Sequence, residues 1–198
     1  MEKTKERPLR DRVDTEERLI EAAADLLGEL GPRAVSVRVI AERAGVNHGL
    51  VHHYFGGKAG LLRSAMTKLV KDHESYAVGQ SKDKRYPAPL ALTGDQRYLR
   101  AVLRCVLDGE MELAEMELTT DSSVPRAALT AEMKRRNVSQ ADAQLKAAFG
   151  LFMATEMGWA ALEPFIFSVT QTANDKEKQE VRDAARTQLR QMEIEKFR

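Results

Sequence analysis

Four side chains in one short stretch combine hydrogen-bond donors with positive or titratable charge: His48, His52, His53 and Lys58. Such groups bind phosphate oxygens and the acceptor atoms on base edges. His48 and His52 are also four residues apart, which is the spacing of two metal ligands on one helix face. No Cys, Asp or Glu lies close by in the sequence to complete a metal site. The stretch therefore favours contacts to nucleic acid, and we expect no metal and no cofactor.

Two short helices joined by a tight turn would position these side chains. Ser36 is suited to cap a helix over residues 37–44, and Gly45 can adopt the positive φ that ends it. Asn47 is suited to cap a second helix over residues 48–55. This order predicts a helix-turn-helix.

The same pattern also fits an ordinary helical hairpin, because Ala41, Gly45 and Val51 supply only a crossing point, a turn and an apolar contact. Two local features favour the DNA-binding interpretation. Gly49 lies inside the second helix, where glycine lowers helix stability by about 1 kcal/mol relative to alanine. A close approach of the backbone to a DNA groove would explain a glycine at this position. Lys58 begins the next helix, where the dipole disfavours a cation unless a phosphate binds there.

The segment from residue 14 to residue 62 resembles the DNA-binding domain of the TetR family of bacterial transcription regulators. The matching residues are Glu21-Ala22-Ala23, Leu26-Leu27, Gly31, Val35-Ser36-Val37, Ile40-Ala41, Ala44-Gly45-Val46, Phe55, Lys58 and Leu61-Leu62. The resemblance strongly covers about a quarter of the chain. The family usually has tyrosine at the position of His52 and often serine or aspartate at that of Gly57. These departures concern individual phosphate contacts rather than the motif.

The resemblance implies that the second helix lies in a major groove. We expect Asn47, His48, Gly49 and His53 to face base edges or sugars. We expect Ser36, Arg38, His52 and Lys58 to hold phosphates.

The bulk composition limits the kind of partner. The 198 residues are 43% hydrophobic and carry a net charge of +1, so DNA binding must come from the placement of charges. Cys105 is the only cysteine, which excludes a disulfide framework and a cysteine metal site. The chain contains no run of 18 apolar residues and its N-terminus is charged, so we expect a cytoplasmic protein with no membrane segment.

Helical periodicity continues along the chain and no strand alternation interrupts it, which predicts an all-α fold. We expect a flexible arm at 1–13, a DNA-binding domain at 14–57, and an effector-binding and dimerisation domain at 58–198. Further predicted helices cover 14–30, 58–76, 96–107, 110–118, 125–136, 140–163 and 175–196, with a loop at 79–95. Asp14 and Ser139 are expected to cap two of them, and Pro164 to end the longest.

The resemblance also implies a homodimer built from the last two long helices, and a small-molecule pocket among the middle helices. Candidate pocket residues are Leu99, Val102, Leu103, Val106, Met116, Phe149, Met153, Glu156 and Trp159. Met and aromatic side chains at helical spacing are also ordinary core residues. Glu156, an acid among apolar neighbours, could line the pocket, pair with an arginine across a subunit interface, or be exposed.

The sequence therefore predicts a ligand-responsive transcription regulator that binds a palindromic double-stranded DNA operator as a homodimer. Repression is the leading hypothesis, and activation is the alternative. One alternative is a small helical enzyme, but the sequence lacks a nucleophile–base pair and a phosphate-binding loop. Another alternative is a helix-turn-helix that binds a protein partner. The exposed histidines and Lys58 suit phosphates better than an apolar partner surface.

Overall fold

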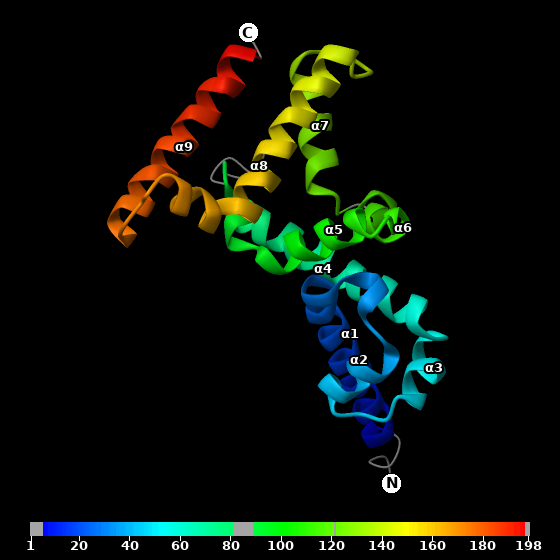
Figure 1. Cartoon of the computed structure of the whole chain (residues 1–198). Coiled ribbons are helices and arrows are strands. Elements are labelled where there is room, and N and C mark those ends of the chain that lie inside the picture. The colour runs from blue at the N-terminus through cyan, green and yellow to red at the C-terminus, as the bar shows by residue number, and fades with distance from the viewer. Residues whose placement is uncertain (1–5, 81–88, 121, 197–198) are drawn as a thin grey trace. The chain divides into compact units, whose positions relative to one another are not determined.

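The computed structural model describes residues 6–80, 89–120 and 122–196, and every regular element in these ranges is helical (Figure 1). The predicted all-α fold is confirmed. The elements are α1 (Glu6–Ala34), α2 (Val37–Ala44), α3 (Gly49–Phe55), α4 (Lys58–Gln80), η1 (Ala91–Gly94), α5 (Gln96–Leu107), α6 (Met111–Ala114), η2 (Glu115–Thr119), α7 (Val124–Arg135), α8 (Ala143–Val169) and α9 (Asp175–Lys196). Within those ranges, none of the helices is long and apolar enough to cross a membrane.

The chain forms two compact units. The first comprises Met1–His73 and Arg100–Ser122, and the second comprises Glu74–Leu99 and Ser123–Arg198. Because α4 and α5 each contribute residues to both units, neither unit is one continuous segment. The predicted boundary between the DNA-binding domain and the effector domain, at residues 57 and 58, divides the chain by function rather than by packing. It stays a prediction.

The core of the first unit joins α1 to the two short helices that follow it. Large apolar side chains from four helices are fully buried there, and the main ones are Leu19, Leu26, Leu27, Ile40, Val51, Leu61 and Met66. Ala41 is only 2% exposed, as a small residue at a helix crossing must be. This packing holds α2 and α3 against α1, which is the dark-blue helix in Figure 1.

Helix α1 is longer than predicted. It begins at Glu6, so Asp14 lies inside the helix and the predicted cap there is wrong. Pro8 falls in the first turn, where proline removes no intrahelical hydrogen bond. Residues 1–5 of the predicted arm lie outside the described residues. The predicted stop is confirmed, because Gly31 has φ 80° and ψ 162° and kinks the helix before a last short turn.

Helix α8 differs from the prediction at both ends. Asp142, not Ser139, caps it, and the Asp142 carboxylate accepts a hydrogen bond from Leu145 N at 2.7 Å. The helix also continues through Pro164 to Val169. Proline has no N–H to donate to the carbonyl four residues earlier. Gln96 Nε2 donates to that carbonyl, Ala160 O, at 3.0 Å, so the helix is not broken.

Arg182 of α9 makes several contacts with α8. Arg182 donates to both carboxylate oxygens of Glu163, at 2.9 and 2.7 Å, and its guanidinium lies 5.1 Å from the centre of the Phe167 ring. These hydrogen bonds hold the pKa of Glu163 below its usual range. Asn174 caps α9, because its side chain accepts from Glu177 N at 3.0 Å.

The remaining differences are local. The predicted helix at 110–118 is the short α6 followed by the 3-10 helix η2, and α4 continues to Gln80. The predicted loop at 79–95 contains η1, and its residues 81–88 lie outside the described residues. Ser123 caps α7 by accepting from Arg126 N at 3.3 Å.

Replacing each of the two candidate caps of α8 should have a different effect on the free energy of unfolding. Asp142→Ala should lower the free energy of unfolding by about 1 kcal/mol, because a backbone amide of the first turn loses its partner. Ser139→Ala is the matched control and should leave stability within about 0.5 kcal/mol. Thermal and urea unfolding followed by circular dichroism measures both. A larger loss in Ser139→Ala than in Asp142→Ala would restore the sequence-based cap.

Candidate nucleic-acid interface

The interface begins with a short helix closed at both ends. The Ser36 hydroxyl oxygen accepts from Val39 N at 3.3 Å, which confirms the predicted cap of α2. At the other end Gly45 adopts φ 66° and ψ 38°, as predicted. Gly45 N and Val46 N donate back to carbonyls of the last turn, at 3.1 and 3.0 Å. This left-handed closure reverses the chain within two residues.

Arg18 of α1 completes the closure. Its guanidinium donates to the carbonyl oxygens of Ala44 and of Gly45, the second at 3.1 Å. A Cβ atom at Gly45 would lie 2.9 Å from Arg18 Nη2, so a side chain there would be strained by both φ and space. Sequence reasoning missed this contact because Arg18 lies 26 residues before Ala44 and no local pattern joins them.

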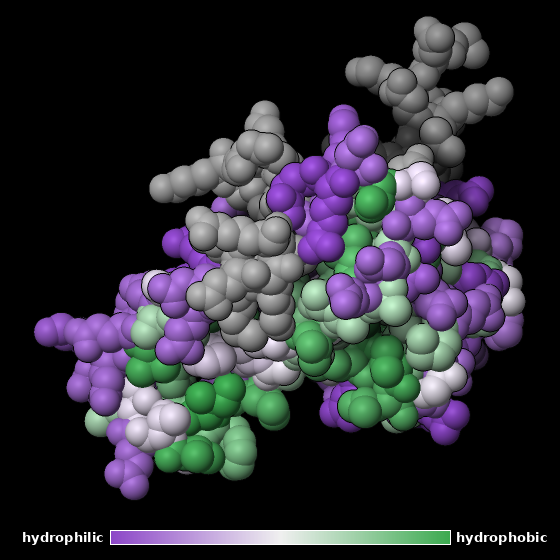
Figure 2. Space-filling view, turned by 90° about the horizontal axis from the view of Figure 1, so that it is seen from above, coloured by the Kyte–Doolittle hydropathy of each residue, from purple (hydrophilic) through white to green (hydrophobic). Residues whose placement is uncertain are grey.

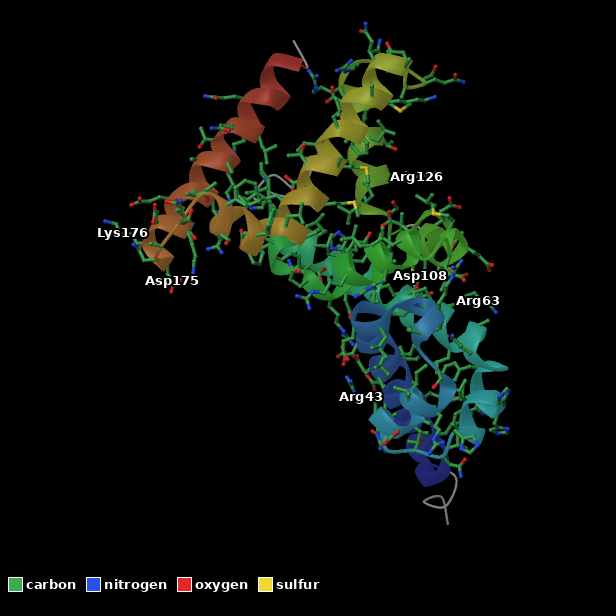
Figure 3. The ribbon with its side chains drawn as sticks, viewed as in Figure 1. Arg43, Arg63, Asp108, Arg126, Asp175 and Lys176 are labelled. Atoms are coloured by element: carbon green, nitrogen blue, oxygen red, sulfur yellow. The ribbon has the colours of Figure 1, made fainter. Side chains whose placement is uncertain are left out.

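A second arginine ties α2 to α1. Arg43, labelled on α2 in Figure 3, donates to both carboxylate oxygens of Glu29 at 3.0 and 2.9 Å. The hydrogen bonds from Arg43 hold the pKa of Glu29 below its usual range. Arg43 is therefore paired with α1, although about half of each side chain is exposed. Arg38, on the same helix, is exposed and forms no ion pair with any residue that the structure describes.

Helix α3 starts from Asn47. The Asn47 amide oxygen accepts from Gly49 N at 2.8 Å, which confirms that Asn47 caps this helix. His48 follows in a helical conformation, with φ −61° and ψ −24°. A Cβ at Gly49 would lie 3.2 Å from the Asn47 amide oxygen, so a side chain here would crowd the cap. This contact is a local reason for glycine in addition to a close approach to DNA.

The residues predicted to contact DNA lie on the surface. Seven are exposed: Ser36, Arg38, Asn47, His48, Gly49, His52 and His53. Lys58 is half-buried, and Val51 on the opposite face of α3 is fully buried. No acidic residue occurs within α3. The helix thus presents a polar face without negative charge, which is the arrangement that a phosphate backbone requires.

The corner after α3 holds the other predicted phosphate contacts. Gly56 and Gly57 both have positive φ, 68° and 117°. The His52 ring lies 3.5 Å from the position of a Cβ at Gly57. Lys58 begins α4, with Nζ 3.5 Å from the carbonyl oxygen of Arg33. His52 and Lys58 therefore flank one corner, although they come from two helices. Among the described residues no cluster of His, Cys, Asp or Glu could hold a metal ion.

The predicted effector residues do not form one set in the structure. Val102, Leu103, Val106 and Met116 belong to the first unit, and Leu99, Phe149, Met153, Glu156 and Trp159 belong to the second. Leu99 is 1% exposed and Val106 is 45% exposed. Their role as ligand contacts stays a prediction.

Glu156 has a structural partner. It is 7% exposed, and both of its carboxylate oxygens accept from Leu90 N, at 2.9 and 2.8 Å. Leu90 has φ 64°, an uncommon conformation for a branched side chain. The alternative that Glu156 is simply exposed is therefore wrong. Its carboxylate holds the backbone at the start of η1.

Known proteins share both the segment and the fold. Residues 19–65 match the family described as bacterial regulatory proteins, tetR family. An HTH-type transcriptional repressor of Mycobacterium tuberculosis, Rv3405c, is 31% identical over 153 residues, which are 77% of this chain and 75% of that protein. An HTH-type transcriptional regulator of Chromohalobacter salexigens, BetI 1, is 32% identical over 101 residues, covering 51% of this chain and 45% of its own.

Solved structures show the same fold at lower identity. A tetR-family transcriptional regulator from Streptomyces coelicolor has a TM-score of 0.54 at 23% identity and covers 74% of this chain and 70% of its own. GusR of Salmonella enterica has a TM-score of 0.55 at 17% identity and covers 90% and 94%.

The contact made by Arg18 can be tested against Arg38. Arg18→Met should lower the free energy of unfolding by about 1 kcal/mol, because two carbonyl oxygens at the end of α2 lose a charged donor. Arg38→Met removes an exposed arginine and should change stability by less than about 0.5 kcal/mol. Urea unfolding of both variants measures the difference. Equal stabilities would contradict the role assigned to Arg18.

Proposed function

The chain belongs to the TetR family of bacterial transcription regulators, and we propose that it acts as a homodimeric, ligand-responsive repressor of a palindromic operator. The observation that carries this proposal is the exposed polar face of α3, held by the closed turn after α2. The name of the M. tuberculosis relative supports repression rather than activation. Because its target is bacterial DNA, we place the regulator in the cytoplasm.

The proposed contacts divide into two sets. Asn47, His48, Gly49 and His53 face base edges or sugars. Ser36, Arg38, His52 and Lys58 hold phosphates. Two-fold symmetry would set the two α3 helices about 34 Å apart, in successive major grooves, so the operator should be an inverted repeat.

The caps limit what two of these side chains can recognise. Because the Asn47 amide oxygen accepts from Gly49 N, one of its two lone pairs is already used. The NH2 group is then the main group for DNA, and it would read an acceptor such as guanine O6 or N7. The Ser36 oxygen likewise accepts from Val39 N, which leaves its hydroxyl hydrogen for a phosphate.

The surface of α8 supports dimerisation. Leu151, Leu162, Phe165 and Val169 are each more than half exposed, at 60, 52, 65 and 64%. At 100° per residue their directions fall within about 60° of one another, so they form one apolar stripe. Apolar patches reach the surface among hydrophilic ones (Figure 2). An exposed stripe of this kind on a long helix fits a second copy of the same helix.

The ligand response would be a shift between two dimer states. A small molecule bound among the middle helices would favour the state whose α3 spacing no longer fits the operator. Such a shift cannot exceed the difference in the ligand's affinity for the two states. The effector residues predicted from the sequence remain the candidates for this contact.

The rival functions are weaker. The relatives are transcription regulators by name rather than enzymes. A helix-turn-helix that binds protein would more often expose an apolar face, whereas α3 and the turn before it expose histidines and an asparagine.

Selection of bound fragments from genomic and random duplex DNA tests the DNA-binding part. We expect an inverted repeat with half-sites about 10 base pairs apart, centre to centre. Recovery of an asymmetric site would contradict the dimeric operator, and recovery of nothing above background would contradict DNA binding.

Lys58→Ala then tests the phosphate contact. It should weaken binding to all sequences about equally and reduce the salt slope of log K by about 1. Lys146→Ala, an exposed lysine on α8, is the matched control and should leave both unchanged. Fluorescence anisotropy at several salt concentrations measures affinity and slope. An unchanged slope in Lys58→Ala would remove Lys58 from the contact set.

Phe165→Glu tests the dimer. A charge in the middle of the apolar stripe should convert a dimer to a monomer at micromolar concentration, because it would be buried unpaired. Val138→Glu places the same charge on an exposed apolar residue outside the stripe and should leave the dimer intact. Sedimentation equilibrium measures the mass of each variant. A dimer that survives in Phe165→Glu would place the interface elsewhere.

A further inference from the structure

The second unit contains a pocket that none of the predicted effector residues lines. It has a volume of about 700 Å³, which is the size of a small-molecule site. Its walls come from the end of α4, with Tyr76 and Gln80, from residues 89–94, and from one face of α9. All of these segments belong to the same compact unit.

The α9 wall carries an arginine ladder, which we define as Arg182, Arg186 and Arg190. The three are spaced four residues apart, so each successive pair has its Cα atoms about 6 Å apart along one helix face. Asp183 is the only acidic residue in the described lining. The pocket therefore has an excess of positive charge, which attracts an anion.

The three arginines differ in how strongly each is bound to a carboxylate of the protein. Arg182 is held on Glu163 by two hydrogen bonds and forms part of the attachment of α9. Arg186 donates to Asp183 at 2.9 Å, and the Asp183 side chain is 61% exposed. An ion pair between such solvated groups is weak, so a ligand oxyanion can replace it. Arg190 is exposed and pairs with no carboxylate in the part of the chain that the structure describes.

The opposite wall contains an unsatisfied polar atom. The hydroxyl oxygen of Thr93 is buried and has no hydrogen-bond partner among the residues that the structure describes. Buried polar atoms in folded proteins are normally paired, and exceptions often mark the site of a missing partner. Thr93 belongs to the pocket lining, so a ligand oxygen that settles against this wall would supply the partner.

We propose that this pocket binds a small molecule through a carboxylate or phosphate group, held by Arg186 and Arg190, and that this molecule is the effector. Guanidinium groups bind both oxyanions in the same two-pronged geometry, so the shared chemistry is a planar or tetrahedral oxyanion. The assignment as effector rests on the proposed function. The assignment as an anion site rests on the pocket alone.

Isothermal titration of the full-length protein with inorganic phosphate and, separately, with glutarate tests the anion site. The two probes distinguish a phosphate ligand from a carboxylate ligand, and sodium chloride keeps the ionic strength equal. We expect at least one probe to bind the unchanged protein at least tenfold more tightly than it binds Arg186→Gln/Arg190→Gln. Arg126→Gln, which removes an exposed arginine of α7 outside the pocket lining, should bind like the unchanged protein (Figure 3).

Absence of binding for both probes, or equal binding in the double variant, would overturn the proposal. Arg190→Gln alone should still weaken binding, and it changes a residue without a described carboxylate partner, so loss of folding cannot explain its effect. Circular dichroism confirms the helix content of each variant.

The effector assignment is tested with the recovered operator DNA. The bound probe should change operator affinity in the unchanged protein and not in the double variant. If the probe binds but operator affinity is constant, the effector assignment is overturned. If no DNA is bound at all, the proposed function fails, and the titration still decides the anion site.

Discussion

The closure of α2 is the constraint on which the DNA-binding surface depends. Helix α3 has seven residues, too few to be stable by itself. Its direction is set by the left-handed Gly45, and the carbonyls left open there are satisfied by Arg18 from α1. Val51 then fixes the buried side of α3 against the core. The histidines and Asn47 thus reach the surface because contacts from α1, from the turn after α2 and from the core all fix the same turn.

The second unit is held together in a different way. Side chains there form hydrogen bonds with backbone groups that have no partner within a helix. Glu156 accepts from the amide of the left-handed Leu90, and Gln96 donates to the carbonyl that Pro164 leaves open. Glu163 joins Trp159 and Arg182 at the junction of α8 and α9. Buried polar groups of this kind are costly unless paired, so each pair selects one arrangement of the helices.

Local signals in the sequence were sufficient where the contacts are local. Ser36, Gly45 and Asn47 were predicted because caps and turns involve residues within a few positions. The start of α1 was wrong because Asp14 was taken as its cap, although the helix begins at Glu6 and Asp14 lies inside it. The end of α8 was wrong because Gln96, 64 residues from Ala160, compensates for Pro164. Contacts made by residues far away in the chain, such as Arg18 and Gln96, produce no pattern in a single sequence from which they could be predicted.

Pro164 also has a consequence for how the second unit folds. An isolated α8 would lack one hydrogen bond in its last third, between residues 160 and 164. Gln96, at the start of α5, donates to the carbonyl oxygen of Ala160 that Pro164 leaves open. The full length of α8 therefore depends on a contact with a segment far away in the chain. Phe165 and Val169, the last part of the exposed apolar stripe, lie beyond this proline, so their place on the helix depends on the same contact.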